Sequence, residues 1–155
     1  MLFCLTSNLI HVIIYIDHRE TSNKKGNVPM KKINTISELK KIISETSVPL
    51  YVRWSRGPAK DKKQGVSKDY QSGANHAGLS AIEIEQEWGC EDKYLARRIN
   101  EYLFLRIKDC AIGCWIYTGK RVGEDTDGYD SIINISVVAR VSNKLIDKLQ
   151  VIKNV

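Results

Sequence analysis

The sequence predicts one α+β domain, with an antiparallel or mixed sheet of about four strands and about three helices. Apolar residues recur at helical spacing in some segments, whereas β-branched and aromatic residues dominate others. These segments follow the order helix, strand, loop, strand, helix, strand, strand, helix. That order favours a sheet with its helices on one side, and 155 residues is the length of an ordinary single domain.

Three helices are expected. Thr35 and Glu38 have the spacing of a capping box, and the apolar residues that follow predict a helix over 36–46. Leucine, isoleucine and tyrosine at turn spacings predict a second helix over 92–108. Ser142 is a suitable N-cap for a last helix, whose apolar stripe consists of Leu145, Ile146, Leu149 and Ile152.

Strands are predicted over 50–54, 78–82, 112–118 and 131–141. Alternation along the first strand places Tyr51 and Arg53 on the face opposite Leu50, Val52 and Trp54. A Gly- and Asp-rich turn is expected over 119–130. Residues 55–77 are predicted to form a long lysine-rich loop, and loops beyond about 12–15 residues are uncommon in compact domains unless they are functional or disordered.

Residues 1–29 are interpreted as an extension or linker, with the single α+β domain spanning 30–155. Met1 to Ile16 is apolar, but no basic residue precedes it and no small-residue cleavage site follows it, so a signal peptide is not indicated. The segment is also too short to span a bilayer. Residues 17–29 are polar, and a more regular pattern begins at Met30.

The charge balance favours a partner that carries phosphate. The chain has 24 Lys and Arg against 18 Asp and Glu, a formal net charge of +6. Hydrophobic and charged fractions of 43% and 27% exclude global disorder. Cys4, Cys90, Cys110 and Cys114 form no CxxC pair or Cys/His cluster at zinc-ligand spacing, so a structural zinc is not indicated. No metal and no cofactor are predicted. We expect a reduced, cytoplasmic protein with no membrane partner.

The strongest candidate for a functional site lies at the end of the first strand. Arg53 and Arg56 flank the hydroxyl of Ser55, and guanidinium groups bind phosphate and carboxylate through paired hydrogen bonds. The alternative is that Arg53 pairs with an acidic neighbour such as Glu83 or Asp127. The full set of candidate anion-binding residues is Arg53, Ser55, Arg56, Lys60, Lys62, Lys63, Ser80, Arg97 and Arg98.

The remaining candidate polar residues can also be explained without a functional site. The lysines of the 55–77 segment could follow a nucleic-acid backbone, although such runs are more often solvated. His76 is the only histidine of 30–155, and as a catalytic base it would need a carboxylate and a nucleophile that its spacing does not supply. The acidic run from Glu124 to Asp130 fits a turn better than a cation site, and Asp127 is the acidic candidate.

A resemblance to a known family rests on short motifs, which are Tyr51-Val52-Arg53-Trp54-Ser55-Arg56-Gly57-Pro58, Ser67-x-Asp69, Gly78-Leu79-Ser80-Ala81, Glu87-Trp88, Ala96-Arg97-Arg98 and Tyr117-Thr118-Gly119. With these motifs the chain resembles an uncharacterised bacterial family, domain-of-unknown-function family 6098. The resemblance covers about 30–151 and supports Met30 as the start of the domain. It implies no activity.

Three functions are compatible with these features. The first is a small domain that binds a nucleic acid or nucleotide through Arg53, Arg56 and the lysine-rich loop. The second is a nucleotide-dependent enzyme similar to an ADP-ribosyltransferase, a family with an arginine, a hydroxyl-bearing strand and a late acidic residue, here Arg53, Ser80 and Asp127. The third is a protein-interaction domain. Convergence of the candidates on one cleft would favour a ligand site.

Overall fold

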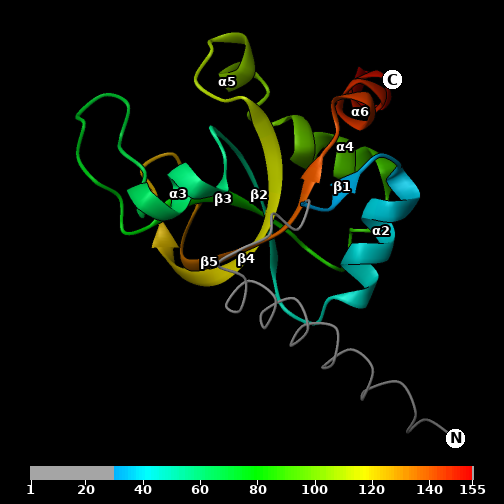
Figure 1. The fold of residues 1–155 in the computed structure, drawn as a ribbon, viewed down its shortest axis with the longest axis horizontal. Helices are drawn as coiled ribbons and strands as arrows, with labels where there is room; N and C mark the ends of the chain where they lie inside the picture. Colours follow the sequence, from blue (N-terminus) through cyan, green and yellow to red (C-terminus); the bar gives the residue numbers. More distant parts are fainter. Residues whose placement is uncertain (1–29, 155) are drawn as a thin grey trace, which may run out of the picture.

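The computed structural model describes residues 30–154, so the predicted extension over 1–29 lies outside the described part of the chain (Figure 1). The α+β class is confirmed. In chain order the elements are β1 (Lys32–Ile33), α2 (Ile36–Glu45), β2 (Leu50–Ser55), α3 (Pro58–Gln64), β3 (Leu79–Ile84), α4 (Asp92–Asn100), α5 (Phe104–Ile107), β4 (Gly113–Glu124), β5 (Asp130–Val141) and α6 (Asn143–Asn154).

The strands form one mixed sheet in the order β1-β5-β3-β2-β4, and β4 also pairs with β5. All pairings among β2, β3, β4 and β5 are antiparallel, whereas β1 runs parallel to β5. These four antiparallel strands therefore close on themselves. The closure depends on the long β4–β5 hairpin, which has three register shifts along its length and curves strongly (Figure 1).

Helices α2, α4 and α6 cover one face of the sheet and lie on the same side of it in Figure 1. Each helix contributes a fully buried leucine to the core on this face, namely Leu39, Leu95 and Leu145. They pack with Val52 of β2 and Ile116 of β4. The apolar spacing that predicted these helices is thus the spacing of their buried faces.

The opposite face of the sheet has its own, smaller core. It consists of Tyr51, Leu79, Ala81, Trp115, Tyr117 and Ile132. The alternation predicted for the first strand is confirmed, because Tyr51 belongs to this cluster while Val52 and Trp54 belong to the helix-covered one. Gly78 sits where this face is tightest, since a Cβ there would lie 2.5 Å from the carbonyl oxygen of Ile132.

The prediction of a structureless loop over 55–77 is wrong in its first half, where the lysine-rich stretch forms α3. Pro58 occupies the start of this helix, where its missing N–H costs nothing. Gly57 before it has φ 116° and Gly65 after it has φ 71°, both in the region that favours glycine. A proline inside the start and a glycine past the end are helix signals, although both residues are also common in loops.

Two other boundaries differ from the prediction. The helix predicted over 92–108 is divided into α4 and α5, because residues 101–103 form a tighter turn with a Leu103 N–H to Asn100 C=O hydrogen bond of 3.1 Å. The turn expected over 119–130 is shorter, because β4 continues to Glu124 and β5 begins at Asp130. Within 30–154, no helix is long and apolar enough to cross a bilayer.

Candidate functional site

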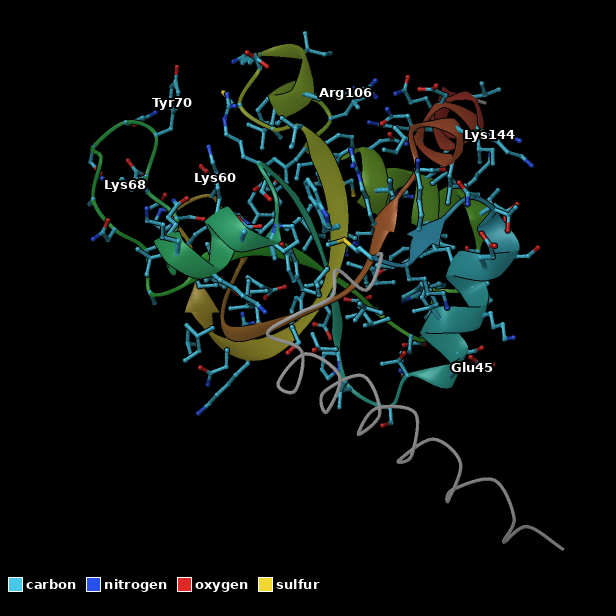
Figure 2. The ribbon with its side chains drawn as sticks, viewed as in Figure 1. Glu45, Lys60, Lys68, Tyr70, Arg106 and Lys144 are labelled. Atoms are coloured by element: carbon cyan, nitrogen blue, oxygen red, sulfur yellow. The ribbon has the colours of Figure 1, made fainter. Side chains whose placement is uncertain are left out.

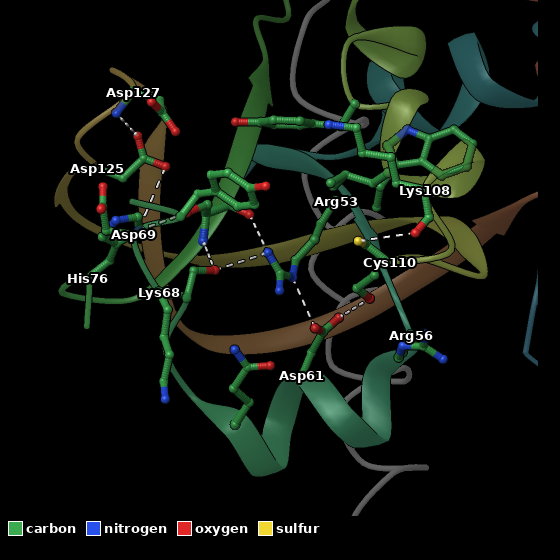
Figure 3. A pocket seen from close by; sticks show the side chains of 18 of the residues that line it. Arg53, Arg56, Asp61, Lys68, Asp69, His76, Lys108, Cys110, Asp125 and Asp127 are labelled. Carbon is green, nitrogen blue, oxygen red and sulfur yellow. Dashed lines mark hydrogen bonds and ion pairs between the residues drawn. The ribbon is translucent and has the colours of Figure 1, made fainter. Parts of the chain in front are cut away.

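A cleft of about 830 Å³ opens beside α3, at the end of β2 (Figure 3). Its walls come from α3, the segment over 65–78, the β4–β5 turn and α5, and the end of β2 forms part of its floor. Figure 2 shows Lys60, Lys68 and Tyr70 on this side of the molecule, away from Glu45 of α2 and Lys144 of α6. A cleft of this volume is in the range of about 300–1,000 Å³ that holds small-molecule ligands.

The structure brings most of the predicted site residues together. Those that line the cleft are Arg53, Ser55, Arg56, Lys60, Ser80 and Asp127. Lys62 and Lys63 are exposed elsewhere on α3 and do not line it. Arg97 lines a separate pocket with Trp88, and Arg98 lies over the ring of Tyr94. These four basic residues are therefore not part of the cleft.

Arg53 forms the floor of the cleft and is held by three hydrogen bonds (Figure 3). Its Nε donates to Asp61 Oδ1 at 3.0 Å, and its Nη1 donates to the Ser80 carbonyl oxygen at 2.7 Å and to Ser67 Oγ at 3.3 Å. The side chain is only 12% exposed. Arg53 thus joins α3 to the start of β3, and its charge is balanced by a carboxylate.

Asp61 is the buried centre of this network. Its Oδ2 accepts hydrogen bonds from Ser55 Oγ at 2.6 Å and from the Tyr117 hydroxyl at 2.7 Å. Burial, and then the hydrogen bond to Asp61, raise the pKa of Tyr117 above its usual range. The carboxylate has three partners in all, so its burial at 2% exposure is compensated.

Sequence reasoning had proposed Glu83 or Asp127 as the partner of Arg53, and the partner is Asp61. The prediction of a loop over 55–77 gives no reason to single out Asp61, because a loop carboxylate is normally solvated. A helix that starts at Pro58 would have put Asp61 in its first turn, directed at the strand that precedes it. The helix-start signal at Gly57-Pro58 was therefore the information that could have identified this residue.

Basic side chains line the end of the cleft between α3 and α5. Arg56 is positioned by a hydrogen bond from its Nη2 to the carbonyl oxygen of Asp109. Lys108 lies 5.7 Å from the centre of the Phe104 ring. Lys60 projects from α3 into the cleft and forms no ion pair within 30–154. This end therefore presents positive charge that forms no ion pair with a carboxylate of the described residues.

Acidic side chains lie at the other end of the cleft, in the β4–β5 turn and the 65–78 segment (Figure 3). Asp69 accepts hydrogen bonds from the Thr126 hydroxyl and from Ser72, and these partners hold the pKa of Asp69 well below its usual range. Asp125 Oδ1 accepts from the backbone N–H of Asp127. The Asp69–Thr126 hydrogen bond ties the turn to the 65–78 segment.

His76 lies among these acidic groups and is 8% exposed. Its Nδ1 is 3.2 Å from Ser80 Oγ and 4.0 Å from Asp125 Oδ2, and its Nε2 is 3.4 Å from Thr126 Oγ1. The carboxylate and the hydroxyl that spacing along the chain did not supply are thus supplied by the fold. Among residues 30–154, no three His, Cys, Asp or Glu side chains gather in a way that would hold a metal ion.

A family model matches residues 26–153 and is described as a family of unknown function, DUF6098. The chain belongs to the DUF6098 family. Comparisons with curated proteins and with solved structures found no match. The matched segment contains every residue that lines the cleft of this chain.

The run from Tyr51 to Pro58 has a structural explanation in this DUF6098 domain. Its apolar members fill the two cores, and its Gly-Pro pair starts α3. Arg53 and Ser55 bind Asp61, which leaves Arg56 as the member whose guanidinium faces the cleft without a carboxylate partner within 30–154. The motif therefore builds the floor and one wall of the cleft.

Proposed function

We propose that this DUF6098 domain binds a small anionic ligand of the nucleotide type in the cleft. Its negatively charged group lies at the end that Arg56 and Lys60 line. The observation that carries the proposal is the positive charge of this end, where no acidic side chain within 30–154 pairs with Lys60. An arginine already held by a backbone carbonyl also loses less conformational freedom when it binds a phosphate.

Aromatic side chains along the same cleft support a ligand that contains a base. Tyr70 is 95% exposed and Phe104 is 45% exposed, and both line the cleft together with Tyr102. These rings offer flat faces on which a nucleobase can stack. A ligand with a base and a phosphate would stack its base on the aromatic side chains and place its phosphate near the basic ones.

A small ligand explains the distribution of basic residues better than a nucleic-acid strand does. Lys63, Arg97 and Arg98 lie away from the cleft, so the basic residues of 30–154 are not gathered into one continuous stripe along it. A protein that follows a phosphate backbone needs several cations along one groove. The proposal therefore narrows the expected partner from nucleic acid or nucleotide to a nucleotide-sized molecule.

Arg53 has a supporting part in this proposal. Its Nε and Nη1 are occupied, and its charge is balanced by Asp61. It holds α3 against β3 and so keeps Lys60 and Arg56 in place. Direct recognition of the anion belongs to these two residues.

A second candidate is a nucleotide-dependent enzyme similar to an ADP-ribosyltransferase. In its favour, Arg53, Ser80 and Asp127 all line the one cleft, as that hypothesis requires. Against it, dinucleotide phosphates would have to compete with the buried Asp61 carboxylate for Arg53. This candidate predicts that NAD binds more tightly than ADP.

The test is a calorimetric titration with ADP and NAD at low and moderate salt, in wild type and in two lysine variants. Lys60→Gln removes a charge that lines the cleft, and Lys63→Gln removes the same charge from the same helix outside it. We expect Lys60→Gln to raise Kd by about tenfold, the loss of one charge-assisted hydrogen bond. Lys63→Gln should leave Kd nearly unchanged.

Three outcomes decide between the candidates. Binding that Lys60→Gln weakens and Lys63→Gln does not supports the proposal. A preference for NAD that Arg53→Lys abolishes supports the second candidate. Equal effects of the two lysine variants, or binding of short oligonucleotides alone that disappears as salt rises, would contradict the proposal.

A further inference from the structure

The hydroxyl of Ser80 is positioned at the edge of the cleft as a nucleophile would be. Its Oγ is 3.2 Å from His76 Nδ1, and both side chains line the cleft. Its backbone is held on both sides, since its N–H donates to Ser67 Oγ at 2.9 Å and its C=O accepts from Arg53 at 2.7 Å. A serine fixed in this way and in contact with an imidazole has the geometry of a nucleophile with its base.

The neighbours of His76 determine which ring nitrogen carries the hydrogen. Thr126 Oγ1 is 2.6 Å from Asp69 Oδ2, so its single hydrogen is donated to that carboxylate. Thr126 Oγ1 is then an acceptor toward His76 Nε2, at 3.4 Å, and Nε2 carries the hydrogen. Nδ1 is left with its lone pair directed toward Ser80, as a general base requires.

Asp125 supplies the charge that a protonated His76 would need. Its Oδ2 lies 4.0 Å from His76 Nδ1, and its side chain is 2% exposed. An imidazolium that forms when Nδ1 takes a proton would therefore face a buried carboxylate rather than bulk water. Thr126 and Asp69 orient the ring, and Asp125 stabilises its charged form.

Arg53 also places a donor near the reacting hydroxyl. Its Nη1 is bound to the Ser80 carbonyl oxygen, while its Nη2 has no hydrogen-bond partner within the described part of the chain. Arg53 lines the cleft, so this N–H group can reach a ligand atom next to Ser80. An oxyanion that develops there would meet a fixed positive group.

The charges around Ser80 indicate which bond could react. Asp125 and Asp127 line this end of the cleft, and a negatively charged phosphoryl group would be repelled by them. An uncharged acyl group would not. We propose that Ser80, with His76 as general base, attacks the carboxylic ester of an anionic ligand whose charged part lies near Arg56 and Lys60, and this proposal rests on the proposed function.

The reaction needs no co-reactant other than water. Ser80 Oγ forms a bond to the carbonyl carbon as its proton moves to His76 Nδ1, and the carbon–oxygen bond of the ester breaks as that proton passes to the leaving alkoxide. The products are an acyl-Ser80 ester and an alcohol. Water then gives its proton to His76, attacks the acyl carbon and releases a carboxylic acid, and the proton returns to Ser80.

The test uses the full chain with p-nitrophenyl acetate, and follows nitrophenolate release and the acetylated residue by mass spectrometry. Ser80→Ala removes the nucleophile and His76→Gln the base, and Ser44→Ala on the exposed surface of α2 is the matched control. We expect acetylation at Ser80, and a rate that each of the first two variants lowers by about a hundredfold or more. Ser44→Ala should keep the wild-type rate.

Thr126 is proposed as a positioning residue, and a pair of substitutions separates this role from a structural one. Thr126→Ser keeps the acceptor for His76 Nε2–H and should retain most of the rate, whereas Thr126→Val removes it and should lose about tenfold. Equal rates in the serine and valine variants would contradict the positioning role.

Failure of this inference is distinguishable from failure of the proposed function. Nucleotide binding that depends on Lys60, together with acetylation that Ser80→Ala does not change or that falls on other residues, would overturn the inference alone. Acetylation of Ser80 without any nucleotide binding would overturn the proposed ligand. Protection of Ser80 from acetylation by ADP would support both.

Discussion

The two faces of the sheet are filled in different ways. On the helix-covered face, residues such as Leu95 and Ile116 pack against one another, and the Trp54 indole N–H is satisfied by the Ile99 carbonyl oxygen at 2.6 Å. On the opposite face, the partly buried Arg53 forms an ion pair with the buried Asp61, which also accepts hydrogen bonds from Ser55 and Tyr117. The cleft opens at the end of β2 and is lined from both sides of the sheet, by Arg53 from the second face and by Trp54 and Tyr102 from the helix-covered core.

The contrast suggests different roles for the apolar contacts of the helix-covered face and for the polar network around Arg53. Apolar burial is favourable wherever surfaces fit, whereas a buried charge is tolerated only when every partner is in place. A charged face is therefore an expensive way to stabilise a sheet, unless its polar groups also position a site. On this view the helix-covered face stabilises the domain, and the network around Arg53 shapes the cleft.

The largest effect is expected from breaking the buried ion pair. Asp61→Ala leaves Arg53 without its carboxylate and removes the acceptor for Tyr117, so we expect a loss of about 3–5 kcal/mol in the free energy of unfolding, measured with urea. The double variant Arg53→Met/Asp61→Leu removes both charges and should be less destabilised than Asp61→Ala. If Asp61→Ala unfolds at the wild-type urea concentration, the network has no structural role.

The helix-covered face should respond differently to a cavity. Leu95→Ala removes a fully buried side chain, and we expect a loss of about 2–5 kcal/mol in the same urea experiment. Because Leu95 does not line the cleft, the Kd for ADP should stay close to that of wild type at temperatures where the variant is folded. A large change in Kd would show that the two faces are not independent.

Alkaline pH should act on both faces through groups buried in their neutral form. Burial raises the pKa of Cys114 on the helix-covered face and the pKa of Tyr117 on the opposite face. The folded chain therefore holds these protons more tightly than the unfolded chain does. Their contribution to the free energy of unfolding is fully present below the unfolded-state pKa values. It is lost progressively as the pH rises above those values.

For each such group the free energy of unfolding should fall by at most about 1.4 kcal/mol per pH unit above its unfolded-state pKa. Tyr117→Phe removes one of these groups and should make the fall between pH values of about 10 and 11 shallower. Urea unfolding at a series of alkaline pH values measures the slope. A slope unchanged in Tyr117→Phe would mean that Tyr117 ionises in the folded chain as readily as in the unfolded one.

A smaller effect is expected at the start of α2, far from the cleft. Thr35 Oγ1 accepts from the Glu38 N–H at 3.1 Å and completes the capping box. Thr35→Ala should lower the free energy of unfolding by about 1 kcal/mol, whereas Thr35→Ser should change it little. Neither substitution should alter ligand binding, and thermal unfolding with and without ADP checks both statements.

The helix-covered face could be predicted from the sequence because its signals are local. The capping box of Thr35 and Glu38, and the alternation of Val52 and Trp54 with Tyr51, depend only on neighbours along the chain. The Gly-Pro pair before α3 was also a local signal, although it was interpreted as part of a loop.

The candidate site could be predicted only in part, because its contacts join distant segments. Arg53 and Ser80 were identified individually, but the hydrogen bond between them spans 27 residues. The hydroxyl of Thr126 and the ring of His76 are 50 residues apart in the chain. Periodicity has no information about such pairs, and only the closure of β4 and β5 onto β2 and β3 brings them together.

The most direct test of the central claim is to map where ADP contacts the domain, by amide chemical-shift changes in an NMR titration. The account predicts that the largest changes fall on Arg56, Lys60, Lys68 and Ser80, which line the cleft. Changes gathered on α2 and α6, or around Trp88 and Arg97, would contradict it, because the ligand would then bind outside the cleft.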